Sequence, residues 1–143
     1  MSATTNKATT DIASLIPQRP PIVMVSEYGY EDSDTGWSKL HIKSDNIFLD
    51  ADGRMTAEGV IEHIAQTAAA HIGFKHRLAG EDVGVGFIGD IKRCTVGGPM
   101  PTAGQCLTTN IRIMSQVGNI TMISAETKTD GKTIVTCRMK LTD

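Results

Sequence analysis

Glu62 and Gln66 are the residues of this chain whose types and spacing best suit chemistry. They stand four positions apart in a run with helical periodicity, so their side chains share one face of the predicted helix. The neighbouring stretch Ala65-Gln-Thr-Ala-Ala-Ala70 is rich in alanine, and a carboxylate placed beside it can act as a general acid or base. Periodicity alone favours an exposed glutamate on an amphipathic helix, so the catalytic interpretation needs support from the rest of the chain.

The helix that carries both residues is predicted by an apolar repeat. Apolar side chains recur at the spacing i, i+3, i+4, i+7 and i+11, at Ile61, Ile64, Ala65, Ala68 and Ile72. Thr56 is suited to cap the start of this helix, and Gly80 stands just beyond its expected end near Arg77.

The remaining segments predict strands. Apolar or alternating runs occur at Ile22–Val25, Trp37–Lys43, Val83–Thr95, Cys106–Ser115, Ile120–Thr129 and Lys132–Leu141. The pairs Gly118-Asn119 and Asp130-Gly131 suit tight hairpin turns, which makes the last three strands an antiparallel meander. The pattern as a whole predicts an α+β domain in which a curved antiparallel sheet wraps a long central helix, because the alanines keep that helix thin. This arrangement is the hotdog fold.

Length and charge restrict the organisation and the partners. The 143 residues predict one domain at 11–143, preceded by a flexible tail at 1–10. The formal net charge of −2 is spread along the chain without a basic run, which argues against nucleic acid or an anionic membrane as a partner. The polar start has no apolar signal segment, and no stretch is long enough to span a membrane, so a cytoplasmic protein is predicted.

Cysteine and histidine positions give no sign of a metal or cofactor. Cys94, Cys106 and Cys137 are widely spaced, which favours reduced core residues over a zinc site. The glycine pairs are not followed by helical patterns, so no phosphate-binding loop is predicted either. Among the histidines, we expect a solvated strand position for His41 and a helix-surface or interface position for His63 and His71.

Four segments, spread in order between Leu15 and Leu141, carry a family resemblance. They read Leu15-Ile-Pro-Gln-Arg-Pro-Pro-Ile22, Gly59-Val-Ile-Glu-His-Ile-Ala-Gln66, Gly86-Phe-Ile-Gly-Asp-Ile-Lys-Arg93 and Pro101-Thr-Ala-Gly-Gln-Cys-Leu107. Together they resemble the 3-hydroxyacyl-(acyl carrier protein) dehydratases of fatty acid synthesis. The stretch from Ile61 to Gly73 resembles most closely the dehydratase-like subfamily of aryl-polyene pigment clusters.

The resemblance implies roles for particular residues. Glu62 matches the catalytic carboxylate that opens the family's Glu-x-x-Ala-Gln motif, Gln66 matches its glutamine, and Gly89 falls in the strand beside the acyl tunnel. The backbone N–H groups around Ala57, Glu58 and Gly59 could bind the thioester oxygen, aided by the helix dipole. The resemblance also implies an acyl carrier protein or coenzyme A thioester as substrate, and a homodimer or larger hotdog assembly, which could be heteromeric.

One part of the family pattern is missing. The fatty-acid enzymes carry a catalytic histidine in a Gly-His-Phe-Pro loop before the helix, and this chain has no such loop. Counting back from Glu62 puts Phe48 at the histidine's place, whereas counting forward from the Asn46-Ile-Phe48 segment puts Asp52 there. Asp50, Asp52 and Arg54, from the same chain or from a partner subunit, remain candidates for a second catalytic group.

Three functions follow as alternatives. The first is a dehydratase that eliminates water from a 3-hydroxyacyl thioester, with Glu62 as the main acid or base. The second is a hotdog acyl-thioesterase, in which a lone helix carboxylate activates water and no histidine is needed. The third is a non-catalytic subunit of a heteromeric dehydratase.

Overall fold

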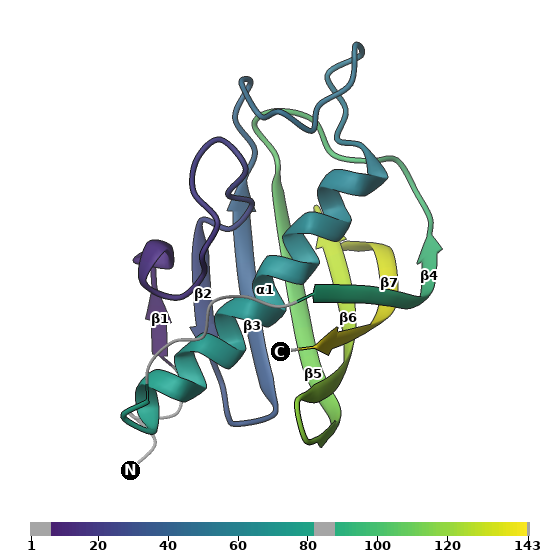
Figure 1. Cartoon of the computed structure of the whole chain (residues 1–143). Helices are drawn as coiled ribbons and strands as arrows, with labels where there is room; N and C mark the ends of the chain where they lie inside the picture. The colour runs from purple at the N-terminus through teal and green to yellow at the C-terminus, as the bar shows by residue number, and fades with distance from the viewer. Residues whose placement is uncertain (1–6, 82–87, 143) are drawn as a thin grey trace.

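One long helix crosses one face of an antiparallel sheet in this protein (Figure 1). The computed structural model describes residues 7–81 and 88–142. Within them the sheet has seven strands in the order β1-β2-β3-β5-β6-β7-β4. The elements are β1 (Lys7–Thr9), a short 3-10 helix η2 (Ile12–Ser14), β2 (Glu27–Tyr30), β3 (Thr35–His41), α1 (Ala57–Leu78), β4 (Ile88–Val96), β5 (Cys106–Val117), β6 (Ile120–Thr129) and β7 (Lys132–Thr142).

The predicted helix is confirmed at both ends. The Thr56 side chain accepts a hydrogen bond from the Gly59 N–H at 3.2 Å and so caps the first turn. At the other end Gly80 adopts a φ of +74°, the left-handed conformation that favours glycine after a helix. The capping residue and the terminating glycine thus fix the length of α1 locally.

The core lies between α1 and the inner face of the sheet. Ile64 and Ala68 of α1 are 0% exposed and pack in one cluster with sheet residues such as Leu107, Ile123 and Met139. Because Ala68 and its neighbour Ala70 have short side chains, the sheet backbone can approach the helix closely. The predicted α+β architecture of a central helix against a curved antiparallel sheet is confirmed.

Alternation along β3 separates the two faces of the sheet. Ser38 and Leu40 are buried against the helix, whereas Trp37, Lys39 and His41 lie on the outer face, as the sequence predicted. The meander of β5, β6 and β7 is also confirmed. Its second turn has positive φ at Asp130 and Gly131, which a two-residue hairpin requires.

The beginning of the chain differs from the prediction. Ile22–Val25 was expected to be the first strand, but this segment is not part of the sheet. The strand that follows it, β2, begins at Glu27, and the first strand is β1. Within β2, Gly29 lies under the indole of Trp37, where a Cβ atom would stand 2.0 Å from Trp37 Cε2. A glycine is therefore required at this position, because any larger residue would collide with the Trp37 indole that lies over β2.

The start of the domain also differs from the prediction. Residues 7–9 of the expected tail pair with β2 as strand β1, so the ordered chain starts before Asp11. Residues 1–6 of that tail, and the start of the strand expected from Val83, lie outside the described residues. In the part of the chain that is described, no helix combines the length and apolarity needed to cross a membrane.

Candidate functional site

Glu62 and Gln66 meet on the second and third turns of α1, as their spacing predicted. The Gln66 Nε2 group donates to Glu62 Oε2 at 2.7 Å and to the Ile22 carbonyl oxygen at 2.9 Å. Gln66 Oε1 accepts from the Met24 N–H at 2.7 Å. Both amide hydrogens and the amide oxygen are thereby used, so the orientation of Gln66 is fixed and one oxygen of the half-buried Glu62 carboxylate is fixed with it.

The segment around Met24 is held by α1 rather than by a neighbouring strand. His63 Nδ1 donates to the Met24 carbonyl oxygen at 2.6 Å, while Gln66 binds the Met24 N–H and the Ile22 carbonyl. These side chains satisfy the backbone groups that a sheet partner would otherwise bind. This explains why an apolar run with strand character lies outside the sheet.

His63 is fully buried, in contrast to the predicted surface or interface position. Because the Met24 carbonyl can only accept, the proton of the neutral ring lies on Nδ1 and Nε2 faces Ser38 Oγ at 3.5 Å. Ser38 Oγ is also hydrogen-bonded to Thr67 Oγ1, which donates to the His63 carbonyl. Burial lowers the pKa of His63 from 6.5 to about 4, so the ring is neutral near pH 7.

His71 is also buried, which corrects the second histidine prediction. Its Nε2 donates to the Ser33 carbonyl oxygen at 3.0 Å, and its Nδ1 is hydrogen-bonded to the Tyr28 hydroxyl. Burial lowers the pKa of His71 and raises that of Tyr28, so both groups are neutral. Both nitrogens of His71 are occupied, and the ring is part of the packing between α1 and β2.

The start of α1 offers backbone donors one turn before Glu62. The Gly59 N–H is already bound by Thr56, through both its carbonyl and its side-chain oxygen. Among the described residues, the N–H groups of Ala57 and Glu58 donate to no acceptor. These two groups, and the positive end of the helix dipole, are therefore available to a negatively polarised oxygen.

Phe48 packs directly on this first turn. A Cβ atom at Gly59 would stand 2.5 Å from the Phe48 Cβ, so glycine allows the loop to press against the helix. Phe48 is also the residue found at the histidine's place when counting back from Glu62. An apolar ring therefore lies beside the helix start, in a position from which no proton can be transferred.

The loop candidates for a second group are placed elsewhere. Asp50 Oδ1 accepts from the N–H groups of Asp52 and Arg54, at 2.8 and 3.1 Å, and so stabilises its own turn. The Arg54 guanidinium donates to the Met100 carbonyl oxygen at 2.9 Å. All three side chains are exposed, and within the described chain none of them binds Glu62.

Gly89 lies on β4 opposite Leu141, where a Cβ atom would stand 3.3 Å from the Met139 sulfur.

The structure also brings together two residues that the sequence did not link. His41 Nδ1 lies 3.1 Å from Cys106 Sγ, across the paired strands β3 and β5. The expectation of three core cysteines is wrong for Cys94, which is exposed, whereas Cys137 is buried. In the described residues no group of three His, Cys, Asp or Glu side chains could hold a metal ion.

Comparison with known families establishes the family of the chain. Residues 10–143 match the model of the ApeP-like family, described as ApeP dehydratase. The chain belongs to this family. The family resemblance drawn from the four sequence segments is thereby confirmed. No curated protein matches the chain.

Solved structures establish the fold. The ApeI:P dehydratase heterocomplex of Xenorhabdus doucetiae is similar over 92% of this chain and 90% of that chain, with 18% identity and a TM-score of 0.81. The PaaI protein of the E. coli phenylacetic acid degradation operon covers 78% of both chains, with 15% identity and a TM-score of 0.59. Thioesterase superfamily member 2 of Mus musculus covers 76% of this chain and 74% of its own, with 13% identity and a TM-score of 0.56. The predicted hotdog fold is confirmed.

Proposed function

We propose that this member of the ApeP-like dehydratase family eliminates water from a 3-hydroxyacyl thioester, with Glu62 as the main acid and base. The thioester is carried by an acyl carrier protein or by coenzyme A. The observation that carries the proposal is the Glu62–Gln66 pair, in which one carboxylate oxygen is held at 2.7 Å and the other has no partner among the described residues. A fixed carboxylate with one free oxygen is suited to move a proton.

A single carboxylate can complete the elimination in two steps. Glu62 first takes the proton from the carbon next to the thioester carbonyl, and the electron pair of that C–H bond moves into the enolate. The enolate then forms the double bond as the C3–O bond breaks, and the protonated Glu62 gives its proton to the departing hydroxyl, which leaves as water. The same proton is taken up and returned, so no second side chain is needed.

The enolate oxygen needs stabilisation while the proton is on Glu62. The N–H groups of Ala57 and Glu58 are unbound within the described chain and lie at the positive end of α1. Hydrogen bonds from backbone donors to a developing oxyanion commonly account for about 100-fold or more in rate. We therefore assign the thioester carbonyl to this helix start.

A heteromeric dehydratase is the second candidate. It is supported by Phe48 beside the helix start, because an enzyme that needs two groups would have to obtain the second one from another subunit. Asp50, Asp52 and Arg54 remain candidates for that group only if a partner subunit presents them. In this version the chain supplies the Glu62 surface or shapes the interface for an active homologue.

A thioesterase is the third candidate. In it Glu62 activates water, which fits the half-exposed carboxylate.

The test uses the purified full chain with 3-hydroxyacyl thioesters on an acyl carrier protein and on coenzyme A. The proposed reaction yields a trans-2-enoyl thioester, measured by mass spectrometry, whereas a thioesterase releases free thiol. Glu62→Gln is expected to lower the rate about 100-fold or more without changing the unfolding temperature. Glu81→Gln, beyond the end of α1, makes the same charge change as a control and is expected to keep full activity.

The outcomes separate the candidates. Full turnover by Glu62→Gln would refute the role of Glu62. Thiol release without an enoyl product would favour the thioesterase. Dehydration that appears only after a histidine-containing homologue is added would favour the heteromeric subunit.

A further inference from the structure

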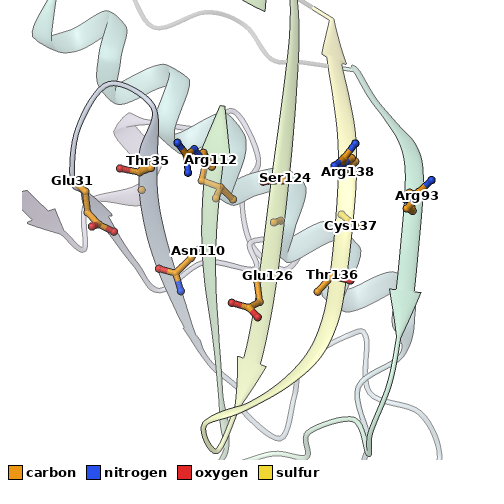
Figure 2. Close-up of a pocket in the computed structure, with 13 residues that line it drawn as sticks. Glu31, Thr35, Arg93, Asn110, Arg112, Ser124, Glu126, Thr136, Cys137 and Arg138 are labelled. Atoms are coloured by element: carbon orange, nitrogen blue, oxygen red, sulfur yellow. The ribbon is translucent and has the colours of Figure 1, made fainter. Parts of the chain in front are cut away.

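A row of arginines crosses the outer face of the sheet, on the side away from α1. Arg112 of β5 is paired with Ser124 of β6, Ser124 is paired with Arg138 of β7, and Arg138 is paired with Arg93 of β4. Figure 2 shows the three arginines with Ser124 between Arg112 and Arg138. The side chains point outward because the residues beside them in β5 and β7, such as Ile111 and Cys137, are buried toward the helix.

These residues line a groove of about 530 Å³. Its floor between the arginines is low, because the Ser124 side chain is small. Two carboxylates also line it: Glu31 at the end of β2, and Glu126, which accepts a hydrogen bond from Thr133 Oγ1 at 2.9 Å. The lining of the groove thus holds three guanidinium groups and two carboxylates, and the Glu126 carboxylate is already engaged by Thr133.

The arginines have no partner among the described residues. No hydrogen bond or ion pair joins any of the three guanidinium groups to a described neighbour. Arg93 and Arg138 are moreover direct cross-strand neighbours, and like charges in this position destabilise a sheet. The chain as a whole carries a net charge of −2, so this cluster of positive charge is local. Because the repulsion between the arginines lowers stability unless a negative charge offsets it, the arginine row indicates an anionic ligand.

The spacing of the row suggests the size of the anion. Arg138 and Arg93 stand on adjacent strands and can bind one anionic group together, whereas Arg112 stands two strands from Arg138, roughly 10 Å across the backbone. Arginine binds phosphate oxygens in pairs with its planar fork of donors. A ligand with two linked phosphates matches this layout, with one phosphate toward Arg112 and the other toward the Arg138–Arg93 pair.

We propose that the groove formed by Arg93, Arg112 and Arg138 around Ser124 binds a diphosphate group. The site is separate from Glu62, because it lies on the opposite face of the sheet from α1 (Figures 1 and 2). It is therefore independent of the reaction proposed above. The Ser124 hydroxyl, between the two halves of the row, can donate to the bridging region of the ligand.

The experiment is calorimetric titration of the full chain with pyrophosphate and with inorganic phosphate, in magnesium-free buffer at constant ionic strength. Pyrophosphate is expected to bind more tightly than phosphate, because only pyrophosphate reaches both halves of the row. Titration with ADP forms a further arm: tighter binding than pyrophosphate indicates a nucleoside diphosphate as ligand, and equal binding indicates the diphosphate alone.

Variants test which residues are responsible. Arg112→Gln and Arg138→Gln are each expected to weaken pyrophosphate binding about tenfold or more, the size expected for one charged hydrogen-bonding partner. Lys132→Gln makes the same charge change on β7 outside the groove and is expected to bind as the wild type does. Without ligand, Arg138→Gln is expected to unfold at a slightly higher temperature, because its repulsion with Arg93 is removed.

Three results would overturn the proposal: no pyrophosphate binding, equal affinity for phosphate and pyrophosphate, or the same loss in Lys132→Gln as in the arginine variants. The last result would show general attraction to positive charge. Glu62→Gln serves to separate this proposal from the proposed reaction, since it is expected to bind pyrophosphate normally while losing activity.

Discussion

Two polar regions share helix α1 and are arranged in different ways. At Glu62 and Gln66 every donor and acceptor of the amide is used, but one carboxylate oxygen has no partner in the described chain. At His63 and His71 burial is complete and the ring donors face carbonyl oxygens of Met24 and Ser33. The first region leaves one hydrogen-bonding position open, whereas the polar groups of the second are used within the protein.

The difference shows that the type of residue does not decide its role. Histidine is the usual proton carrier near neutral pH, yet burial lowers the pKa of both helix histidines. Glutamate is common on helix surfaces, yet Glu62 is the group held in a fixed orientation. The unfilled hydrogen-bonding position marks the candidate site better than residue identity does.

The largest expected effect is a loss of folding stability at low pH, caused by the buried neutral histidines. The unfolded chain binds a proton at His63 near pH 6.5, and the folded chain does so only near pH 4. Between these values the unfolded state holds more protons, so the free energy of unfolding falls as the pH falls, by about 3 kcal/mol over the whole interval. His71 contributes in the same direction.

The measurement is urea unfolding of the full chain at pH 7, 6, 5 and 4.5. His76→Gln, at a half-buried position near the end of α1 that binds Glu81, serves as control and should show the same loss as the wild type. A free energy of unfolding that stays constant down to pH 4.5 would contradict the assignment of His63 as a buried neutral ring.

The next effect concerns both regions. Gln66→Met removes the partner of the Met24 N–H and of the Ile22 carbonyl, which is expected to cost about 2 kcal/mol of stability. It also releases Glu62, so we expect a loss of about tenfold or more in kcat with little change in KM. Gln116→Met, an exposed position on β5, is the matched control in denaturant unfolding and in the enoyl assay. A loss of stability without any loss of kcat would remove Gln66 as the positioning residue of Glu62.

The smallest effect is expected from a change at the buried histidines, and it concerns stability alone. Tyr28→Phe removes the hydroxyl that binds His71 Nδ1 and leaves the ring shape unchanged. We expect a loss of about 1 kcal/mol, which lowers the unfolding temperature of a chain of this size by about 2–4 °C. Activity should be unchanged in the enoyl assay. A large loss of activity would show that the Tyr28–His71 contact also affects the Glu62 site.

Features that depend on neighbouring residues could be predicted from the sequence. Thr56 and Gly80 fix the ends of α1, and Asp130-Gly131 fixes the turn between β6 and β7, because capping and turn geometry are local. The pairing of Glu62 with Gln66 was predictable for the same reason, since four residues make one turn of a helix.

Features that depend on distant residues could not be predicted. The burial of His63 requires Ser38 and the Met24 carbonyl, which come from other parts of the chain. The segment before β2 has the composition of a strand, but side chains of α1 bind its backbone and keep it out of the sheet. The arginine row exists only after four strands are placed in register, since its members are far apart in sequence.

The contact of Trp37 with Gly29 provides a built-in optical probe. Trp37 is the single tryptophan of the chain, so its fluorescence reports one location, the pairing of β2 with β3 at Gly29. Its cross-strand neighbour Asn110 lines the arginine groove. The emission of one native side chain can therefore follow both the unfolding of this hairpin and the filling of the groove, without any attached dye.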